Sequence, residues 1–102
     1  MANARKADSE AERLKTGLQE YASRMYSIPE VAGVALAPGP ERDLFTYIDE
    51  RDWDVCDKLM DVEDALYEMF DDVLFDFHVR YLSGRTFDQS KLTSAEVVYR
   101  RA

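Results

Sequence analysis

The only histidine in the chain, His78, lies in the stretch LFDFHVRY at residues 74–81, between an acid, Asp76, and a base, Arg80. Imidazole and carboxylate groups can perform acid–base chemistry or bind metal ions. Apolar residues alternate with these three polar ones, which predicts a strand with Asp76, His78 and Arg80 on the face opposite the apolar side chains. The alternating apolar residues are Phe75, Phe77, Val79 and Tyr81.

A histidine that acts as a base or a metal ligand needs a convergent partner, and the sequence offers no second histidine. Any metal site would therefore have to be completed by carboxylates, which suits magnesium or manganese. No glycine-rich phosphate loop is present, since the chain has four glycines in total. We therefore interpret His78 as a strand residue and expect no catalytic residue and no cofactor.

Composition limits the class of protein. A chain of 102 residues with 46% hydrophobic residues is enough for one packed domain. The single cysteine excludes an intrachain disulfide and a cysteine-rich zinc site, and favours a reducing cytoplasm. No apolar run approaches the length of a membrane span, and the first residues lack the apolar region of a secretory signal. We therefore expect a cytoplasmic protein without a membrane partner.

The charge is strongly uneven along the chain. The net charge is −8, and residues 41–76 alone hold fourteen acids and three bases, a net −11. This balance argues against direct binding to nucleic acid, which depends on neutralising phosphates. Six carboxylates recur every three or four residues and would form one stripe of a helix: Asp54, Asp57, Asp61, Asp64, Glu68 and Asp71. The stripe is either a solvated face or a docking strip for a basic protein, through Asp57, Asp61, Asp64 and Glu68.

Local patterns predict five elements after a loose leader at residues 1–9. A capping box at Ser9 and Glu12 and an apolar stripe predict a helix at about residues 10–27, which Pro29 ends. Short apolar runs at residues 31–37 and 44–49 predict two strands, joined as a hairpin by the turn at Pro38–Gly39. A helix at residues 53–70 follows, capped by Asp52 or Asp54, and a strand at residues 74–82 comes after it. The apolar stripe that predicts this helix and its core face consists of Val55, Leu59, Val62, Leu66, Met69 and Phe70.

These elements predict an α+β fold, a two-layer αββαβ sandwich at residues 10–82 with both helices on one face of a three- or four-stranded sheet. The other face would carry Asp76, His78 and Arg80, with Ala35 or Ala37 and Thr46 or Ile48 nearby, and could bind a partner. Residues 83–102 would add an edge strand at residues 96–101 or remain an arm that orders on a partner. Its Arg100–Arg101 end could lie against the acidic helix. We expect a homodimer.

The element order, with Asp43 at the second strand and Asp76 in the third, resembles a minimal nucleotidyltransferase-like domain. That resemblance implies two metal ions held by an Asp-x-Asp pair and a third aspartate, and a Gly-Ser motif for the nucleotide phosphates. Asp43 and Asp76 match the first and third aspartates and are therefore candidate metal ligands. Phe45 stands at the second aspartate position and Pro40 follows Gly39, so the resemblance implies a degenerate member that transfers no nucleotide.

Three functions follow from these observations. The first is a small non-enzymatic interaction module that docks a basic protein partner, for example an antitoxin-like inhibitor. The second is a degenerate nucleotidyltransferase-like domain that retains nucleotide or metal binding. The third is a structural subunit of a larger assembly.

Overall fold

The computed structural model describes residues 2–71 and 73–101 of the chain, with side chains from Glu10 onward. The elements, in chain order, are α1 (Ala2–Met25), β1 (Val31–Leu36), β2 (Asp43–Ile48), α2 (Trp53–Met69), β3 (Asp76–Tyr81), α3 (Phe87–Ser90) and β4 (Glu96–Arg100). Within the described part of the chain this is an α+β fold, as predicted.

The four strands form one mixed sheet in the order β3-β2-β1-β4. The predicted hairpin of β1 and β2 is confirmed by their antiparallel pairing. Gly39 in the hairpin loop has a φ of +117°, a conformation that favours glycine. β3 pairs in parallel with β2, and α2 makes the crossover between them. This parallel register places Asp43 opposite Asp76 and Phe45 opposite His78.

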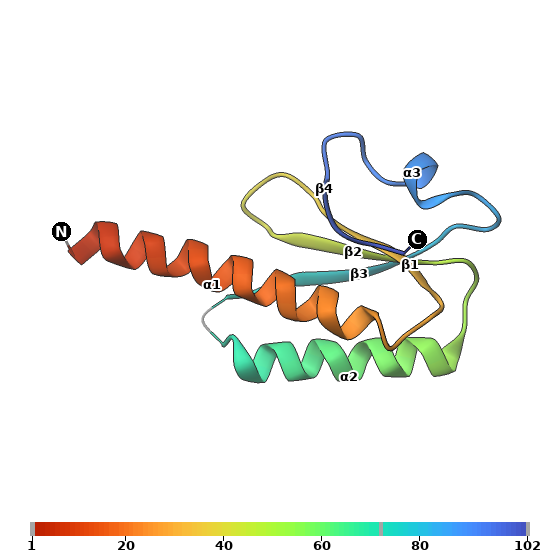
Figure 1. Cartoon of the computed structure of the whole chain (residues 1–102), viewed down its shortest axis with the longest axis horizontal. Coiled ribbons are helices and arrows are strands. Elements are labelled where there is room, and N and C mark those ends of the chain that lie inside the picture. Colours follow the sequence, from red (N-terminus) through yellow and green to blue (C-terminus); the bar gives the residue numbers. More distant parts are fainter. Residues whose placement is uncertain (1, 72, 102) are drawn as a thin grey trace.

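Both long helices cover the same face of the sheet, as predicted (Figure 1). The main core lies between the helices and this face, and Leu59 and Leu66 of α2 are buried in it. The buried Tyr21 hydroxyl pairs with the Thr46 Oγ1 atom at 2.7 Å, and this pairing satisfies both polar groups inside the core. Burial raises the pKa of Tyr21 well above its ordinary value.

Helix α1 begins earlier than the sequence predicted. It starts at Ala2 rather than near residue 10, so the predicted leader is helical from residue 2 onward and the predicted cap at Ser9 falls inside the helix. The physical reason is that residues 2–9 contain neither proline nor glycine and are rich in good helix formers. Figure 1 shows that this N-terminal part of α1 extends beyond the sheet.

Helix α2 follows the prediction closely. Asp52 is its N-cap, and one carboxylate oxygen accepts hydrogen bonds from the backbone N–H groups of Asp54 and Val55. One correction concerns Met69, which the apolar stripe assigned to the core. Met69 is 40% exposed, because the helix ends there and the chain turns so that Phe70 is buried instead.

The second face of the sheet is partly covered, which the sequence did not predict. Phe87 of α3 packs over β1 and β2, and its ring contacts Tyr47 at a centroid distance of 5.2 Å. Gly33 is required beneath it, since a Cβ atom there would lie 2.7 Å from the Phe87 ring. The expectation that Thr46 or Ile48 lies on this face is wrong: both are buried on the helix face, and the alternation of β2 places Tyr47 here.

Residues 96–100 form the edge strand β4, which pairs antiparallel with β1. The expectation that the Arg100–Arg101 end lies against the acidic helix is wrong within this molecule. Arg101 donates hydrogen bonds to the carbonyl oxygens of Met25 and Ile28, both at 3.0 Å, and of Val31 at 2.9 Å. These carbonyls lie at and just after the C-terminal end of α1, where a positive charge is favourable. Arg101 therefore joins the end of the chain to the first helix.

Candidate functional site

The open part of the second sheet face carries the polar residues that the sequence singled out. His78 Nε2 lies 3.0 Å from Asp43 Oδ1 and 3.4 Å from Asp76 Oδ2. The His78 ring also stacks on Phe45, with ring centroids 4.8 Å apart. This stacking and the pairing of β2 with β3 hold the imidazole beside both carboxylates.

These three residues form a potential metal-binding set. One donor atom from each of Asp43, Asp76 and His78 lies within 4.8 Å of the other two. One imidazole nitrogen and two carboxylate oxygens suit a divalent ion such as manganese or zinc. The sequence singled out Asp43 and Asp76 as candidate ligands and required carboxylate partners for any site at His78, and the pairing of β2 with β3 brings the three together. Phe45, at the position of the second aspartate in the resemblance, supplies an aromatic surface and no ligand.

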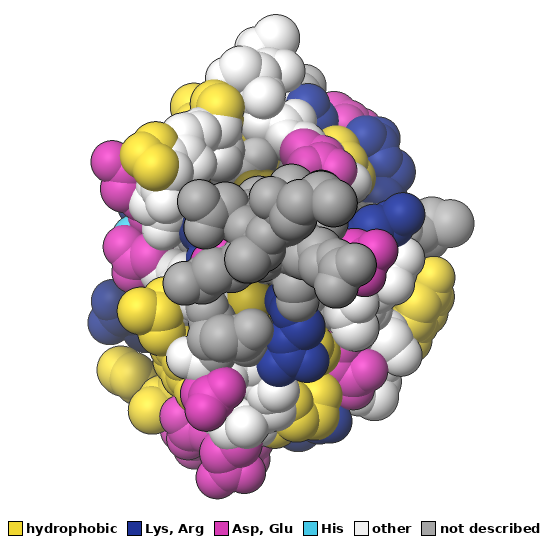
Figure 2. Space-filling view, turned by 90° about the vertical axis from the view of Figure 1, so that its left-hand side faces the viewer, with side chains coloured by type: hydrophobic (Ala, Val, Ile, Leu, Met, Phe, Trp, Pro, Cys, Tyr) yellow, Lys and Arg dark blue, Asp and Glu magenta, His cyan; other side chains and the backbone are white. Residues whose placement is uncertain are grey.

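The acidic stripe of α2 lies on the outer surface of the helix, away from the core. All six of its carboxylate residues are exposed, whereas the core-facing residues of α2 are Val55, Leu59, Val62 and Leu66. Figure 2 shows acidic side chains gathered at the lower end of the molecule, where Figure 1 places α2. The predicted partner-binding residues therefore fall on two surfaces: the α2 acids on the helix layer, and Asp76, His78 and Arg80 on the opposite face of the sheet.

A line of exposed apolar side chains runs beside the acidic stripe. Trp53 is 71% exposed, Met60 58% and Tyr67 41%. They are seven residues apart, so they follow one another along a single side of the helix. On an ideal helix this line lies next to Asp57 and Asp64, and Figure 2 shows hydrophobic side chains beside the acidic ones. This repeat of seven is visible in the sequence beside the acidic repeat.

One carboxylate of α2 differs from the exposed stripe. Glu63 is half-buried, and its burial, followed by the charge of Asp64, raises its pKa to about 7. The pKa of Tyr67 is raised mainly by burial, and the charge of Glu63 raises it further. The Tyr67 hydroxyl donates a hydrogen bond of 2.8 Å to the carbonyl oxygen of Phe75, so Tyr67 also connects α2 to the segment before β3.

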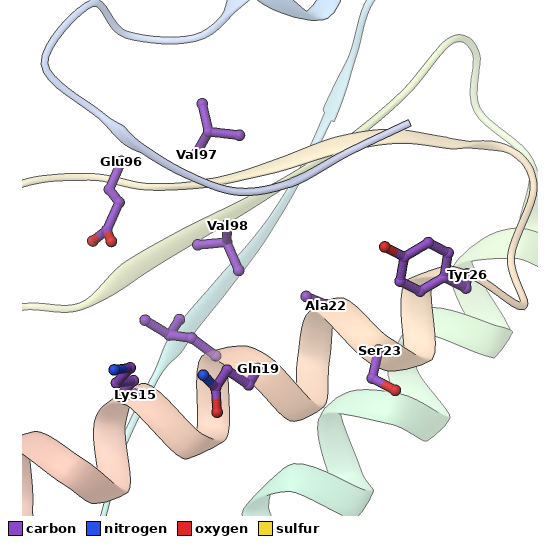
Figure 3. Close-up of a pocket in the computed structure, with 9 residues that line it drawn as sticks. Lys15, Gln19, Ala22, Ser23, Tyr26, Glu96, Val97 and Val98 are labelled. Carbon is purple, nitrogen blue, oxygen red and sulfur yellow. The ribbon is translucent and has the colours of Figure 1, made fainter. Parts of the chain in front are cut away.

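A groove of about 380 Å³ lies between α1 and β4 (Figure 3). Val98 points from β4 toward α1, and Val97 points away. Tyr26 lies at one end of the groove and contacts Tyr99 edge-on, with ring centroids 5.2 Å apart. β4 is at the end of the sheet and pairs with β1 alone among the described strands. A further strand could pair here, but the expected homodimer stays a prediction.

Within the described residues no helix is both long enough and apolar enough to cross a membrane. Comparison of the chain with protein-family models, with curated proteins and with solved structures gives no match. The function therefore has to be proposed from the surfaces described above.

Proposed function

We propose that this protein is an interaction module that docks a basic protein partner through the outer face of α2. The observation that carries the proposal is the pairing of an exposed acidic stripe with an exposed apolar line, Trp53, Met60 and Tyr67, on one helix. An antitoxin-like inhibitor of a basic protein is one form that this function could take.

The two parts of the surface would have different roles in binding. The acidic stripe would attract a basic partner over a distance and increase the rate of encounter. The apolar line would supply the contact area that holds the complex, since large apolar and aromatic side chains contribute most of the binding energy in interfaces. The Arg51 guanidinium lies 5.3 Å from the centre of the Trp53 ring, a cation–π contact at the aromatic end of the line.

The acidic stripe also has a cost for the free protein. Like charges three and four residues apart on a helix repel each other by a few tenths of a kcal/mol per pair. A basic partner would relieve this repulsion on binding. The stripe is therefore better explained by a partner than by the stability of the helix alone.

The test measures association with the partner that the protein captures, at two salt concentrations. The main variant neutralises four acids of the stripe: Asp57→Asn, Asp61→Asn, Asp64→Asn and Glu68→Gln. We expect association to slow and the salt dependence to weaken, because exposed charges act over about 8 Å at physiological salt. A second variant, Trp53→Ala with Met60→Ala, should leave association nearly unchanged and speed dissociation.

A matched control makes the same change in net charge at residues outside α2. It neutralises four other exposed acids: Glu10, Glu12, Glu30 and Glu41. This control should affect binding much less than the α2 variant. An acidic partner, or equal effects of the two four-site variants, would show that α2 is not the docking face.

A second candidate function is binding of a divalent metal ion, favoured by the convergence of Asp43, Asp76 and His78. It corresponds to the degenerate nucleotidyltransferase-like alternative, with metal binding retained and no transfer of a nucleotide. Manganese titration followed by electron paramagnetic resonance tests it. Binding should be lost in His78→Gln and Asp43→Asn and retained in Asp49→Asn, an acid outside the cluster. Equal affinity in all of these variants would remove this candidate.

A further inference from the structure

A small cavity of about 210 Å³ opens on the second face of the sheet, next to the segment that covers it. Its walls combine three aromatic residues and two arginines with a serine and a leucine: Phe45, Tyr47, Arg80, Tyr81, Arg85, Ser90 and Leu92. No acidic residue lines it, although the protein as a whole has a net charge of −8. The cavity therefore has a basic and aromatic wall in a protein that is acidic overall.

The two arginines of this cavity form no ion pair with any residue that the structure describes. The Arg80 guanidinium lies 5.1 Å from the centre of the Phe45 ring, and its charge acts on Tyr47. Arg85 donates from Nε to the carbonyl oxygen of Leu82 at 3.2 Å. That bond fixes the stem of Arg85 and leaves its terminal N–H groups available. Two guanidinium groups beside one cavity are a common way of recognising an oxyanion.

The serine gives an independent indication of a ligand. The Ser90 Oγ atom is buried and has no hydrogen-bond partner in the described part of the protein. A buried hydroxyl without a partner has a free-energy cost and usually calls for an explanation. Rotation of the Ser90 side chain toward the adjacent cavity would let this hydroxyl donate a hydrogen bond to an oxyanion there.

We propose that this cavity binds a small ligand that carries an oxyanion, phosphate or carboxylate, on an aromatic or apolar group. Arg80 and Arg85 bind the oxyanion, Ser90 donates to it, and the ring of Tyr47 contacts the apolar part. The volume, below the range of about 300–1,000 Å³ for drug-sized ligands, restricts the ligand to a small molecule. This site lies on the opposite side of the fold from the α2 docking face and does not depend on that proposal.

The test uses three probes of similar size: phenyl phosphate, benzoate and the neutral benzyl alcohol. Amide resonances of the ¹⁵N-labelled wild-type protein are followed during each titration. We expect saturable shifts at Tyr81, Arg85 and Ser90 with at least one of the two anions, and the tighter anion identifies the preferred oxyanion. The absence of saturable shifts at these residues with either anion, or equal binding of the neutral probe, would overturn the proposal.

Variants then separate the cavity from general attraction of anions. Arg80→Gln and Arg85→Gln should each weaken binding of the anion by roughly tenfold or more, because each removes hydrogen bonds from a charged donor. Arg51→Gln is the matched control, since Arg51 lies 5.9 Å from the Tyr81 ring but does not line the cavity. Equal weakening by Arg51→Gln would refute recognition by the cavity. Because the mapping uses the wild-type protein, the proposal stays testable even if a variant does not fold.

Discussion

Replacing Arg101 with methionine should destabilise the fold far more than an exposed arginine near the end of a chain normally would. The change removes three hydrogen bonds from a charged donor, to the carbonyl oxygens of Met25, Ile28 and Val31. It keeps most of the apolar stem, so it isolates the role of the guanidinium group. These bonds link the residue after β4 to the end of α1.

The size of this loss of stability depends on the three carbonyl acceptors. Hydrogen bonds to charged groups contribute roughly 1.5–3 kcal/mol each. The Met25 carbonyl also accepts from the Ile28 N–H group, and the Ile28 carbonyl from the Val31 N–H group, so neither loses all its partners. Arg101 is also only half-buried, and water would replace part of the loss. We therefore expect a decrease of about 2–4 kcal/mol in the free energy of unfolding, below the simple sum of three bonds.

Urea unfolding followed by circular dichroism measures this change. Arg100→Met is the matched control, because Arg100 forms an exposed ion pair with Asp88 that should contribute less than about 1 kcal/mol. If Arg101→Met destabilises the protein no more than Arg100→Met, the attachment of the chain end to α1 is not a stabilising feature.

Three further predictions concern the core, the half-buried acid and the covered sheet face. Leu59→Ala should lower the free energy of unfolding by about 2–5 kcal/mol, whereas Asp61→Asn should change it little or raise it slightly, as urea unfolding would show. Because the pKa of Glu63 is raised from 4.5 to about 7 in the folded protein, its contribution to stability should fall as pH rises between these values. Glu63→Gln should therefore raise the free energy of unfolding by about 1 kcal/mol at pH 8, after allowance for solvent screening, and by less at pH 5. Urea unfolding at the two pH values measures this difference, and an equal effect at both would contradict the burial of this carboxyl group. Gly33→Ala should cost about 1–3 kcal/mol, because its methyl group would collide with the Phe87 ring, and Phe87→Leu should reduce that cost in thermal unfolding of the double variant.

Periodicity within single segments made much of the fold predictable. The spacing of Leu59 and Leu66 placed them in the core, and both are buried. The alternation around His78 placed its side chain opposite the apolar face of β3. These predictions succeeded because the direction of a side chain within a helix or a strand follows from local backbone geometry. The predicted start of α1 is wrong because the capping pattern at Ser9 competes with the good helix formers that precede it, and the helix begins at Ala2.

The arrangement of the candidate sites depends on contacts between distant segments. Asp43 meets His78 only because β3 pairs in parallel with β2 in one particular register, and Arg80 shares a cavity with Ser90 only because the segment after β3 folds back over the sheet. Likewise, Arg101 reaches the end of α1 only through the pairing of β4 with β1. Strand register and loop placement are decided by the packing of many side chains at once, and no local pattern in the sequence encodes them. The sequence by itself therefore determined which residues face the core, and the tertiary structure decided which of the remaining residues meet.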